Sequence, residues 1–388
     1  MKYLTSGESH GKCLNAIIEG LPSGFEIKEE FINEELKKRQ IGYGRGGRMQ
    51  IETDTVEIKS GIRFGKTIGS PICLEIKNRD FQNWINVMSA SPVDLNNEDI
   101  KNQIAEKTIT KPRPGHADLS GALKYNFDDI RNVLERSSAR ETATRVAIGA
   151  ICQQILKEFD IKGISHVIEI GGVEAGQLSY EEIENNYNND LLCADLKAYQ
   201  KMIKKIDEAK ENGDTLGGKV QIIFKNLPVG LGSYTHWDRK LDGLLAQAVM
   251  SIQAIKSVEF GLGNKYSSTS GANAHDEIGY QDKFNRYTNN AGGIEGGMTN
   301  GEDLIITATM KAIPTMQASL KSIDMNTKEE FQAHFERSDT CAVSACSVVV
   351  KNVVATVLLD AFLDKFGGDS LEEIKANYKN YTEMVQKK

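Results

Sequence analysis

The clearest helix start in the chain lies in residues 136–159, which read RSSARETATRVAIGAICQQILKEF. Ser138 and Glu141 have the spacing of a capping box, in which the serine hydroxyl accepts from the glutamate N–H and the carboxylate reaches back. Apolar residues then recur at helical spacing, which predicts a helix running to about Phe159. Small residues along its sides would let the helix pack closely against another element. We therefore predict a central, buried helix here.

Strand-like segments lie on both sides of this helix. Residues 49–77 alternate polar and apolar residues in short pieces bounded by Gly and Pro, which is typical of strands and hairpins. Three more strand-like runs follow the helix, at residues 164–173, 220–228 and 303–314. Hairpin-like strand pairs beside buried helices favour an α+β fold over a doubly wound parallel sheet.

Three further helices are predicted from apolar periodicity. Residues 28–39 predict a charged amphipathic helix, and Asp238 is predicted to cap a second long helix with an apolar face over residues 241–255. Residues 342–366 predict a third long helix, which the two following glycines would stop. Surface helix and loop are predicted for the polar residues 179–214 and the glycine-rich residues 261–301.

Length and composition leave the domain number open. The chain has 388 residues, 40% of them apolar and 26% charged, so it can bury a substantial core. This length suggests two or three domains. No Pro- or Ser-rich linker divides the sequence, however, so a single compact domain remains an alternative.

Arginine is concentrated in two segments of an acidic chain. The formal net charge is −7, so the surface as a whole does not attract nucleic acid. The chain has 13 arginines against 34 lysines, yet eight of the arginines fall within residues 39–48 and 113–145. Guanidinium groups bind phosphates and carboxylates through paired hydrogen bonds. The clustering indicates an anion pocket, with chance clustering as the alternative.

Cysteine spacing and hydropathy indicate in which cellular compartment the protein is expected. The six cysteines show no CxxC or Cys/His metal spacing, so we expect free thiols and no metal site. The N-terminus, MKYLTSGESHG, lacks an apolar signal region, which favours a cytoplasmic protein. The most apolar stretch, residues 341–363, is interrupted by Lys351, Asn352 and Asp360, which favours a buried helix over a membrane span.

Residues 42–47, GYGRGG, match the GxGxxG spacing of dinucleotide sites only formally. A dinucleotide fingerprint follows a strand and opens a helix, whereas here a predicted helix precedes the glycines and a strand-like run follows them. We therefore reject a Rossmann interpretation. The loop carries Arg45 and Arg48 and would bring both guanidinium groups to an anion; a plain surface loop is the alternative.

Residues 7–11, GESHG, place Ser9 and His10 between two glycines. Neighbouring residues do not easily form a nucleophile and its base, because such side chains must face each other. The sharper hypothesis is that His10 donates a proton to a leaving anion. A histidine in an ordinary turn is the alternative.

Residues 111–118, KPRPGHAD, present three polar side chains from a backbone that two prolines restrict. Asp118 would either orient His116 or stabilise a turn, and Arg113 stands nearby. Residues 136–141 add unpaired helix N–H groups, two hydroxyls and two arginines, which together form an anion site in which plain capping also takes part.

Three of these motifs occur in the order typical of one enzyme family, and the chain closely resembles the chorismate synthases. The motifs are GESHG at 7–11, RPGHADLSGALKY at 113–125 and RSSARETATRVAIGA at 136–150. The segments GLGNKYSSTSGANAHDE, NNAGGIEGGMTNGEDL and ERSDTCAV extend the similarity over nearly the whole chain. We therefore expect one catalytic domain over residues 1–366 and a C-terminal helical tail over residues 367–388.

The resemblance implies a fold, a reaction and a cofactor. The family fold is a β-α-β sandwich, with helices packed between antiparallel sheets, assembled as a homotetramer. The reaction is the 1,4-anti elimination of phosphate from 5-enolpyruvylshikimate 3-phosphate, which gives chorismate and needs reduced FMN without net redox change. The phosphate and two carboxylates of the substrate, with the phosphate of the flavin, would explain the arginines. NADPH is the implied indirect electron source, and whether an external flavin reductase is needed stays open.

The resemblance also implies roles for individual residues. His10 would assist phosphate departure as an acid with Ser9 beside it, and His116 would support the charge of the reduced flavin. Asp339 would help the flavin accept the substrate proton, and Ser137 joins this catalytic group. The implied flavin contacts are Arg136, Ser137, Ser138, Gln253, Ala254, Gly296, Gly297, Lys311, Ala312, Ile313, Pro314, Thr315 and Arg337. The implied contacts to substrate anions or a pyridine nucleotide are Arg39, Arg45, Arg48, Arg113 and Arg136.

Two motifs depart from the family pattern. Many members have a proline where this chain has Ile41, and Arg-His-Asp-Pro-Cys where it has Arg-Ser-Asp-Thr-Cys at 337–341. The missing histidine removes a partner for Asp339, and the missing prolines would loosen both loops. Activity is still expected, because the major motifs are present.

Two other functions remain as alternatives. An NAD(P)H–flavin oxidoreductase would oxidise the pyridine nucleotide without any shikimate ester. A non-catalytic anion- or RNA-binding protein is the other alternative, but aromatic residues that could stack on bases are sparse beside the arginines.

Overall fold

The computed structural model describes residues 1–46, 53–318, 320–333 and 339–388. One of its two main sheets has four antiparallel strands in the order β1-β2-β6-β3. Alternation along β2 turns Leu14, Ala16 and Ile18 into the core, as expected for a sheet with one buried face. The strands are β1 Lys2–Ser6, β2 Cys13–Glu19, β3 Val56–Ser60 and β6 Ile72–Lys77, with a small hairpin of β4 Ile62–Arg63 and β5 Lys66–Thr67.

The second main sheet has five strands in the order β10-β15-β9-β7-β8, and every neighbouring pair is antiparallel. Its pairing joins distant parts of the chain, because Leu304 lies opposite Phe224 and Ile164 opposite Ile223. The strands are β7 Lys162–Ile170, β8 Val173–Glu174, β9 Gly218–Lys225, β10 Ile255–Phe260 and β15 Leu304–Met310. The three strand-like runs predicted after the central helix are therefore confirmed, and so is the α+β class.

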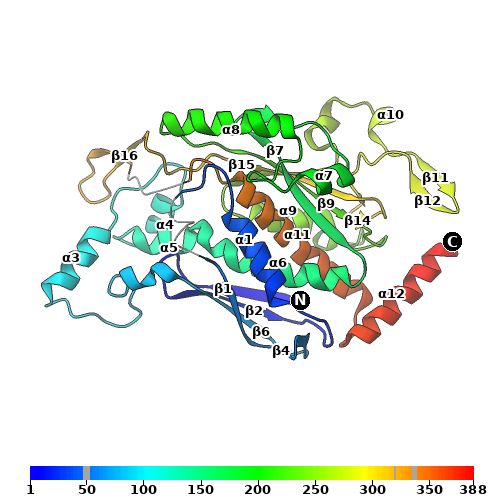
Figure 1. Cartoon of the computed structure of the whole chain (residues 1–388), viewed down its shortest axis with the longest axis horizontal. Coiled ribbons are helices and arrows are strands. Elements are labelled where there is room, and N and C mark those ends of the chain that lie inside the picture. Colours follow the sequence, from blue (N-terminus) through cyan, green and yellow to red (C-terminus); the bar gives the residue numbers. More distant parts are fainter. Residues whose placement is uncertain (47–52, 319, 334–338) are drawn as a thin grey trace.

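Three helices lie between these two sheets (Figure 1). They are α1 Glu29–Gln40, α6 Thr142–Lys157 and α11 Val343–Phe366. Helix α6 contacts β2, β6 and β7, while α11 packs on β7 and β9 and against α6. The two helices approach closely because Gly149 faces Asn352, whose carbonyl oxygen would lie 2.3 Å from a Cβ at Gly149. The predicted central helix with small residues on its sides is therefore confirmed.

Helix α11 is long and apolar enough to cross a membrane by length and composition alone. In this fold, however, 78% of its most apolar window is buried by the protein. Its polar residues Lys351 and Asn352 are buried as well and both contact Glu35 of α1. The helix ends at Gly367, which has a positive φ of 53° that favours glycine. The predicted third long helix is thus a buried element of the core.

The capping box predicted at Ser138 is wrong. Ser138 instead caps a 3-10 turn, η2 Ala139–Glu141, where its hydroxyl accepts from the Arg140 N–H at 3.2 Å. The Glu141 carboxylate pairs with Arg145 at 2.8 Å instead of reaching back to the cap. Helix α6 therefore begins at Thr142, directly after this 3-10 turn.

The second predicted long helix is shorter than expected. Helix α9 spans Leu241–Met250, and the apolar periodicity beyond it belongs to strand β10, which pairs with β15. Asp238 does not cap α9. It lies in the 3-10 turn η3 Trp237–Arg239, and its carboxylate is 2.5 Å from Nδ1 of His236.

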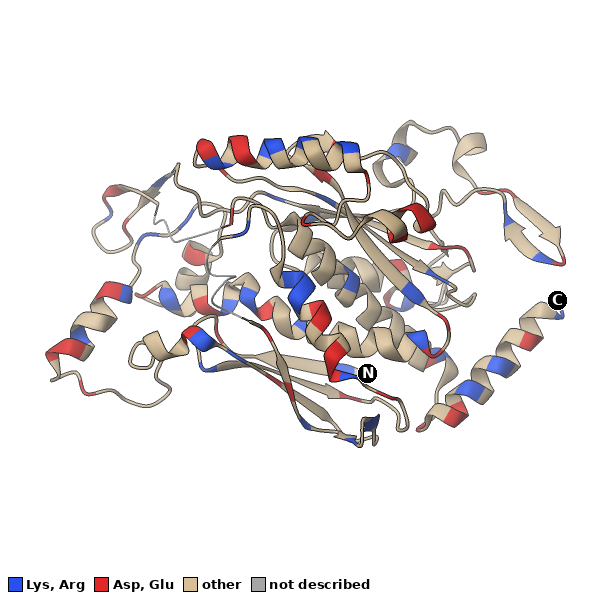
Figure 2. Cartoon of the chain, viewed as in Figure 1, with Lys and Arg blue, Asp and Glu red and all other residues tan. Residues whose placement is uncertain are grey.

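The remaining elements surround this core. Figure 2 shows acidic and basic residues interspersed along the outer helices α8 and α12, whereas α11 is mostly uncharged. The region 261–301, predicted as loop, contains two short hairpins and two short helices. Outer helices are η1 Arg79–Asn83, α3 Glu98–Lys107, α4 Asp118–Tyr125, α5 Arg131–Ser137, α7 Tyr180–Asn186, α8 Leu196–Glu211, η4 Gly263–Ser268, α10 Gly271–Ala274 and α12 Leu371–Gln386. Outer strands are β11 Ile278–Gln281, β12 Lys283–Arg286, β13 Ile294–Glu295, β14 Met298–Thr299, β16 Lys321–Ile323 and β17 Glu330–Gln332.

Candidate active site

A cavity of about 470 Å³ opens where the starts of α6 and α11 meet the loops at His10 and His116. Its volume lies within the range of small-molecule sites. The walls come from segments that are far apart in the sequence but that the helices between the sheets bring together. The predicted residues that line the cavity are Ser9, His10, Arg39, Arg45, Arg113, His116, Ser137, Ser138, Gln253, Ala254, Lys311, Ile313, Pro314, Thr315 and Asp339.

Some predicted residues are not among those that line the cavity. Arg136 is exposed and donates to the carbonyl oxygens of Thr5 and Gly7, at 2.9 and 3.1 Å. Gly296 and Gly297 lie in the turn between β13 and β14, where the Gly297 carbonyl accepts from the start of α9. Ala312 stands between two lining residues without lining the cavity itself. Arg48 and Arg337 lie outside the described residues.

The cavity is strongly cationic for a protein of net negative charge. Among the described residues, its walls carry six Lys or Arg side chains and one carboxylate, that of Asp339. The N-terminal ends of α6 and α11 also face it, since Thr142 and Ala342 are lining residues. Helix N-termini add partial positive charge and free N–H donors. The cavity is therefore built to bind a ligand with several anionic groups.

A buried network holds two of the arginines. The Asp54 carboxylate lies 3.3 Å from Nη1 of Arg39 and 2.6 Å from Nη1 of Arg140. Arg39 also donates from Nε to the Thr142 hydroxyl at 2.9 Å, and Arg140 from Nε to Asn78 at 3.0 Å. Burial lowers the pKa of Arg39 to about 10, although the Asp54 charge opposes that shift. Both guanidinium groups are thus fixed against the cavity wall.

Within the described residues, two of the residues that line the cavity each have a buried polar atom without a hydrogen-bond partner. They are Nη2 of Arg140 and Oε1 of Gln253. Buried polar groups are nearly always satisfied, so each atom is a candidate contact for a polar ligand. The sequence placed Arg140 in an anion site as one of the two arginines of residues 136–141, but the family resemblance gave it no role.

A second ion pair joins the glycine-rich loop to Asp339. Nε of Arg45 is 3.1 Å from Oδ2 of Asp339, and the Gly46 N–H donates to Oδ1 at 2.6 Å. Arg45 and this N–H therefore contact Asp339 in a chain whose neighbouring motif lacks the family histidine. Arg45 lines the cavity and pairs there with Asp339, and its predicted contact with a bound anion stays a prediction.

The proline-flanked turn forms a compact triad. Asp118 is fully buried and accepts from Nε of Arg113 at 2.8 Å, while its other oxygen is 2.5 Å from Nδ1 of His116. Burial opposes the charge of this carboxylate, but the hydrogen bonds from His116 and Arg113 outweigh it and hold the pKa of Asp118 well below its usual range. Arg113 also donates from Nη1 to the Thr315 hydroxyl at 3.1 Å. Asp118 also accepts from the backbone N–H of Arg113 at 3.0 Å, so it contacts His116 and stabilises the turn, and both alternatives hold.

His10 stands on another wall of the cavity and is mostly buried. Its Nδ1 lies 2.8 Å from Oε1 of Glu135 in α5. Lys311 also borders the cavity and donates from Nζ to the carbonyl of Gly115. Burial, together with nearby Lys256, lowers the pKa of Lys311.

Sequence reasoning missed several residues that build this site. Asp54 holds Arg140 in place and Glu135 holds His10, but neither acid belongs to a motif that indicates such a role. Lys256 was missed because it stands alone in a strand. No group of three His, Cys, Asp or Glu residues within the described ranges is placed to hold a metal ion.

Comparison with known proteins gives a consistent result. A family model described as "Chorismate synthase" matches residues 1–363. Chorismate synthase 2 of Bacillus cereus is 52% identical over 384 residues, covering 97% of each chain. The chorismate synthase of Syntrophotalea carbinolica is 53% identical and covers 100% of this chain and 99% of its own. A solved structure titled "Crystal Structure of Chorismate Synthase" matches 100% of this chain and 98% of its own, with a TM-score of 0.79 and 40% identity.

Proposed function

The chain belongs to the chorismate synthase family and catalyses the elimination of phosphate from 5-enolpyruvylshikimate 3-phosphate to give chorismate, and we propose that this reaction takes place in the cavity that His10 and His116 line. The proposal is carried by one observation above all. Two histidines and four arginines from separate segments meet in a single cationic cavity. A substrate with one phosphate and two carboxylates needs this kind of surrounding.

Arg39, Arg113 and Arg140 bind and orient the anionic groups of the substrate in this proposal. Each has its guanidinium group fixed by a buried carboxylate, so little side-chain freedom is lost on binding. The start of α6 adds further positive partial charge nearby. The substrate is thereby held in one orientation before the reaction begins.

His10 donates a proton to the departing phosphate in this proposal, with the hydroxyl of Ser9 beside it. General acid help of this kind contributes about 10²–10⁴-fold to the rate. His116 also lines the cavity and is held by Asp118, so its fixed imidazole supports negative charge on a bound group in this proposal. Asp339 takes part in removing the substrate proton.

The residues present also fit reduced FMN. Nη2 of Arg140 and Oε1 of Gln253 have no hydrogen-bond partner in the part of the chain that the structure describes. With the amine of Lys311, they offer donors and an acceptor to a polar ring system and its phosphate. When bound, reduced FMN supplies electron density that assists the elimination without net redox change. We propose that Ser137, Ser138, Gln253, Ala254 and residues 311–315 hold it, since most of them border the cavity.

An anaerobic assay with chemically reduced FMN tests the proposal. Chorismate formation, followed by absorbance, should need the substrate, the protein and reduced FMN together. A folded sample that forms no chorismate under these conditions would overturn the assignment. Steady oxidation of NADPH without the shikimate ester would point instead to an oxidoreductase.

We also propose that an external reductase supplies the reduced flavin, with NADPH as the indirect electron source. Arg39 and Arg45, the positions that the family resemblance assigns to a pyridine nucleotide, lie inside the same cavity. A nucleotide bound there would compete with the substrate for the same cations. Anaerobic reduction of FMN by this protein with NADPH alone would show the opposite.

The assembly and location are further proposals from family membership. We propose a cytoplasmic homotetramer whose subunits have the β-α-β sandwich fold, with a catalytic unit over residues 1–366 and a helical tail over residues 367–388. In a tetramer, Arg136, Gly296 and Gly297 could serve the cavity of a neighbouring subunit. Light scattering would measure the mass of the assembly, and a monomer in solution would contradict this arrangement.

A further inference from the structure

We propose that Glu135 is a positioning residue that holds the His10 ring in one tautomer and one orientation, with Trp84 as the second support. This inference rests on the proposed role of His10 as a proton donor. It adds a residue that the family motifs do not assign to the reaction. Two independent sets of contacts surround the His10 imidazole.

The first set comes from the carboxylate of Glu135, which is almost fully buried. One oxygen lies 2.8 Å from Nδ1 of His10, and the other accepts from the backbone N–H of His10 at 2.7 Å. The backbone carbonyl of Glu135 also accepts from the Ser9 N–H at 2.9 Å. One residue of α5 therefore fixes both the backbone and the ring of the GESHG loop.

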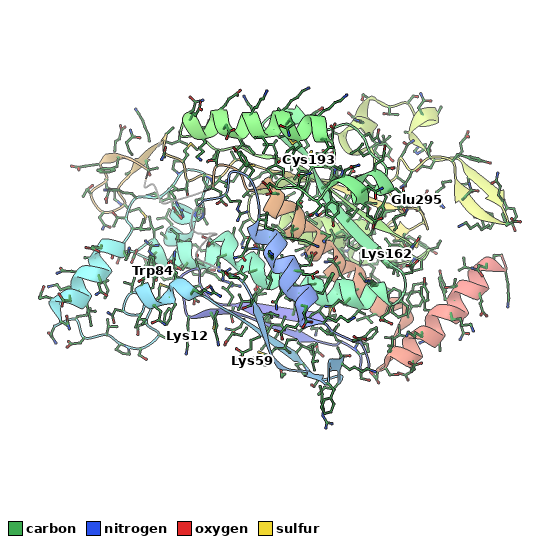
Figure 3. All side chains as sticks on the ribbon, in the orientation of Figure 1. Lys12, Lys59, Trp84, Lys162, Cys193 and Glu295 are labelled. Carbon is green, nitrogen blue, oxygen red and sulfur yellow. The ribbon has the colours of Figure 1, made fainter. Side chains whose placement is uncertain are left out.

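The second set comes from Trp84, which follows η1 and is labelled in Figure 3. The indole ring stacks on the His10 ring with the centroids 4.0 Å apart and the planes 24° from parallel. The indole N–H donates to Asp80 at 3.0 Å, which fixes the tryptophan in turn. The imidazole is thus held in its plane by the carboxylate and against its face by the indole.

Two cations that do not line the cavity complete the arrangement. Nη1 of Arg131 is 3.4 Å from the Glu135 carboxylate, and the same guanidinium lies 5.1 Å from the Trp84 ring centroid. Lys107 places its ammonium 5.0 Å from that centroid. These contacts place a cation beside the buried carboxylate and hold Glu135 in position.

The consequence for His10 follows from hydrogen-bond chemistry. A carboxylate accepts and does not donate, so the His10 nitrogen that faces Glu135 must carry a proton. This places N–H at Nδ1 and leaves Nε2 as the ring nitrogen for the substrate, since Nε2 contacts no polar group within the described part of the protein. When the ring takes up a second proton, Nε2–H is the donor available to a leaving phosphate.

Glu135→Gln separates this role from simple packing. The backbone N–H of His10 lies 2.7 Å from one oxygen, whereas Arg131 contacts the other oxygen only at 3.4 Å. We therefore expect the amide oxygen to face the backbone N–H and the NH₂ to face Nδ1. The neutral ring then has to accept at Nδ1 and carry its proton at Nε2. The variant should therefore switch the neutral tautomer of His10 without changing the size of the side chain.

Solid-state ¹⁵N spectra of histidine-labelled protein, recorded where the ring is neutral, measure the tautomer directly. The His10 signal is assigned as the one that His10→Ala removes. We expect Nδ1–H in the unaltered protein and Nε2–H in Glu135→Gln. We expect kcat in the chorismate assay to fall at least about 10-fold in this variant, with KM nearly unchanged, as when the carboxylate partner of a functional histidine is lost.

Asp238→Asn is the matched control, because it breaks an exposed His–carboxylate pair outside the cavity, with His236 Nδ1 2.5 Å from Asp238. It should leave both the His10 tautomer and kcat unchanged. An unchanged His10 tautomer in Glu135→Gln would overturn the proposal, and so would a switched tautomer with kcat within about 2-fold of the unaltered protein.

Trp84 variants keep the inference testable if Glu135→Gln folds poorly. Trp84→Phe retains a ring for stacking and should keep kcat within about 3-fold, whereas Trp84→Leu removes it and should lower kcat at least about 10-fold. Equal activity in both variants would remove Trp84 from the support of His10. Full turnover in His10→Ala would instead defeat the proposed role of His10 itself, whichever tautomer the spectra show.

Discussion

Asp54 holds Arg140 through both carboxylate oxygens, which lie 2.6 and 2.7 Å from Nη1 of the guanidinium. The same carboxylate reaches Arg39, so one buried acid partly neutralises two cations of the cavity wall. The second terminal nitrogen of Arg140, Nη2, is buried and has no hydrogen-bond partner within the described residues. Asp54 therefore fixes the Arg140 guanidinium and leaves Nη2 without a partner among those residues.

Asp54→Asn should weaken substrate binding and the fold together. We expect KM for the shikimate ester to rise at least about 10-fold, because both arginines lose their shared anchor. The free energy of unfolding should fall by about 3–5 kcal/mol, since the change leaves buried charges unpaired. Steady-state kinetics and urea unfolding measure the two effects.

The matched control is Asp364→Asn, in an exposed pair with Arg239 at 3.6 Å. Surface pairs of this kind contribute little to stability, so this variant should behave as the unaltered protein. Unchanged KM and unfolding in Asp54→Asn would show that Arg39 and Arg140 do not depend on the shared carboxylate.

Asp118→Asn should impair the reaction through His116. The pKa of Asp118 is held well below its usual range by His116 and Arg113 despite burial. The carboxylate therefore stays ionised at neutral pH, and its loss frees the His116 ring. We expect kcat to fall at least about 10-fold and the affinity for reduced FMN to weaken.

The chain offers a close control for this change. His236 and Asp238 have the same spacing in sequence and the same 2.5 Å contact as His116 and Asp118, but they are exposed. Asp238→Asn should have no effect on kcat or on flavin binding measured by fluorescence. If both asparagine variants behave alike, His116 needs no carboxylate partner.

The sequence predicted which motifs contribute to the site, but not which side chains of each motif point into the cavity. Arg136 and Arg140 stand in one motif, and the resemblance assigned only Arg136 to the site. The 3-10 turn η2 between α5 and α6 brings Arg140 to the cavity, whereas Arg136 remains on the exposed side. The capping box failed for a related reason, because Arg145 one helical turn away binds the Glu141 carboxylate.

Contacts across long separations were beyond sequence reasoning. Asp54 meets an arginine 86 positions away, and Glu135 meets a histidine 125 positions away. The residues next to Asp54 and Glu135 in the sequence do not indicate which side chain each acid contacts. The apolar periodicity after Asp238 predicted too long a helix. Ile255 continues the helical spacing but pairs with Met310 in the sheet. Tertiary pairing overrides local periodicity there.

Glu35 should make the fold sensitive to acid. Burial raises the pKa of this carboxyl, but Lys351 at 2.9 Å and Lys38 at 3.0 Å outweigh burial and lower it to about 2, from an ordinary value of 4.5. A depressed pKa in the folded state adds stability above pH 4.5, and that stability is lost as the pH falls toward 2.

Glu35→Gln tests this linkage. At pH 7 it should lower the free energy of unfolding by about 3–5 kcal/mol, because Lys351 is left buried and unpaired. The difference from the unaltered protein should shrink as the pH falls from 4.5 toward 2, as urea unfolding at several pH values would show. Glu57→Gln, in exposed pairs with Lys59 and Lys77, should show no comparable change. A difference that stays constant with pH would contradict the assigned role of Glu35.

Gly149→Ala should destabilise the contact between α6 and α11. A Cβ at Gly149 would lie 2.3 Å from the carbonyl oxygen of Asn352 and 2.5 Å from its Cβ, so the helices would have to separate. Overpacking of this kind costs about 1–3 kcal/mol, even though alanine is the better helix former.

Gly243→Ala in α9 is the control, because a Cβ at this position would have no atom outside its own helix within 4 Å. It should stabilise the protein by about 0.5–1 kcal/mol through helix propensity alone. Thermal unfolding of both variants should therefore shift in opposite directions, and a shift to higher temperature in Gly149→Ala would show that the helices are not in close contact at this point.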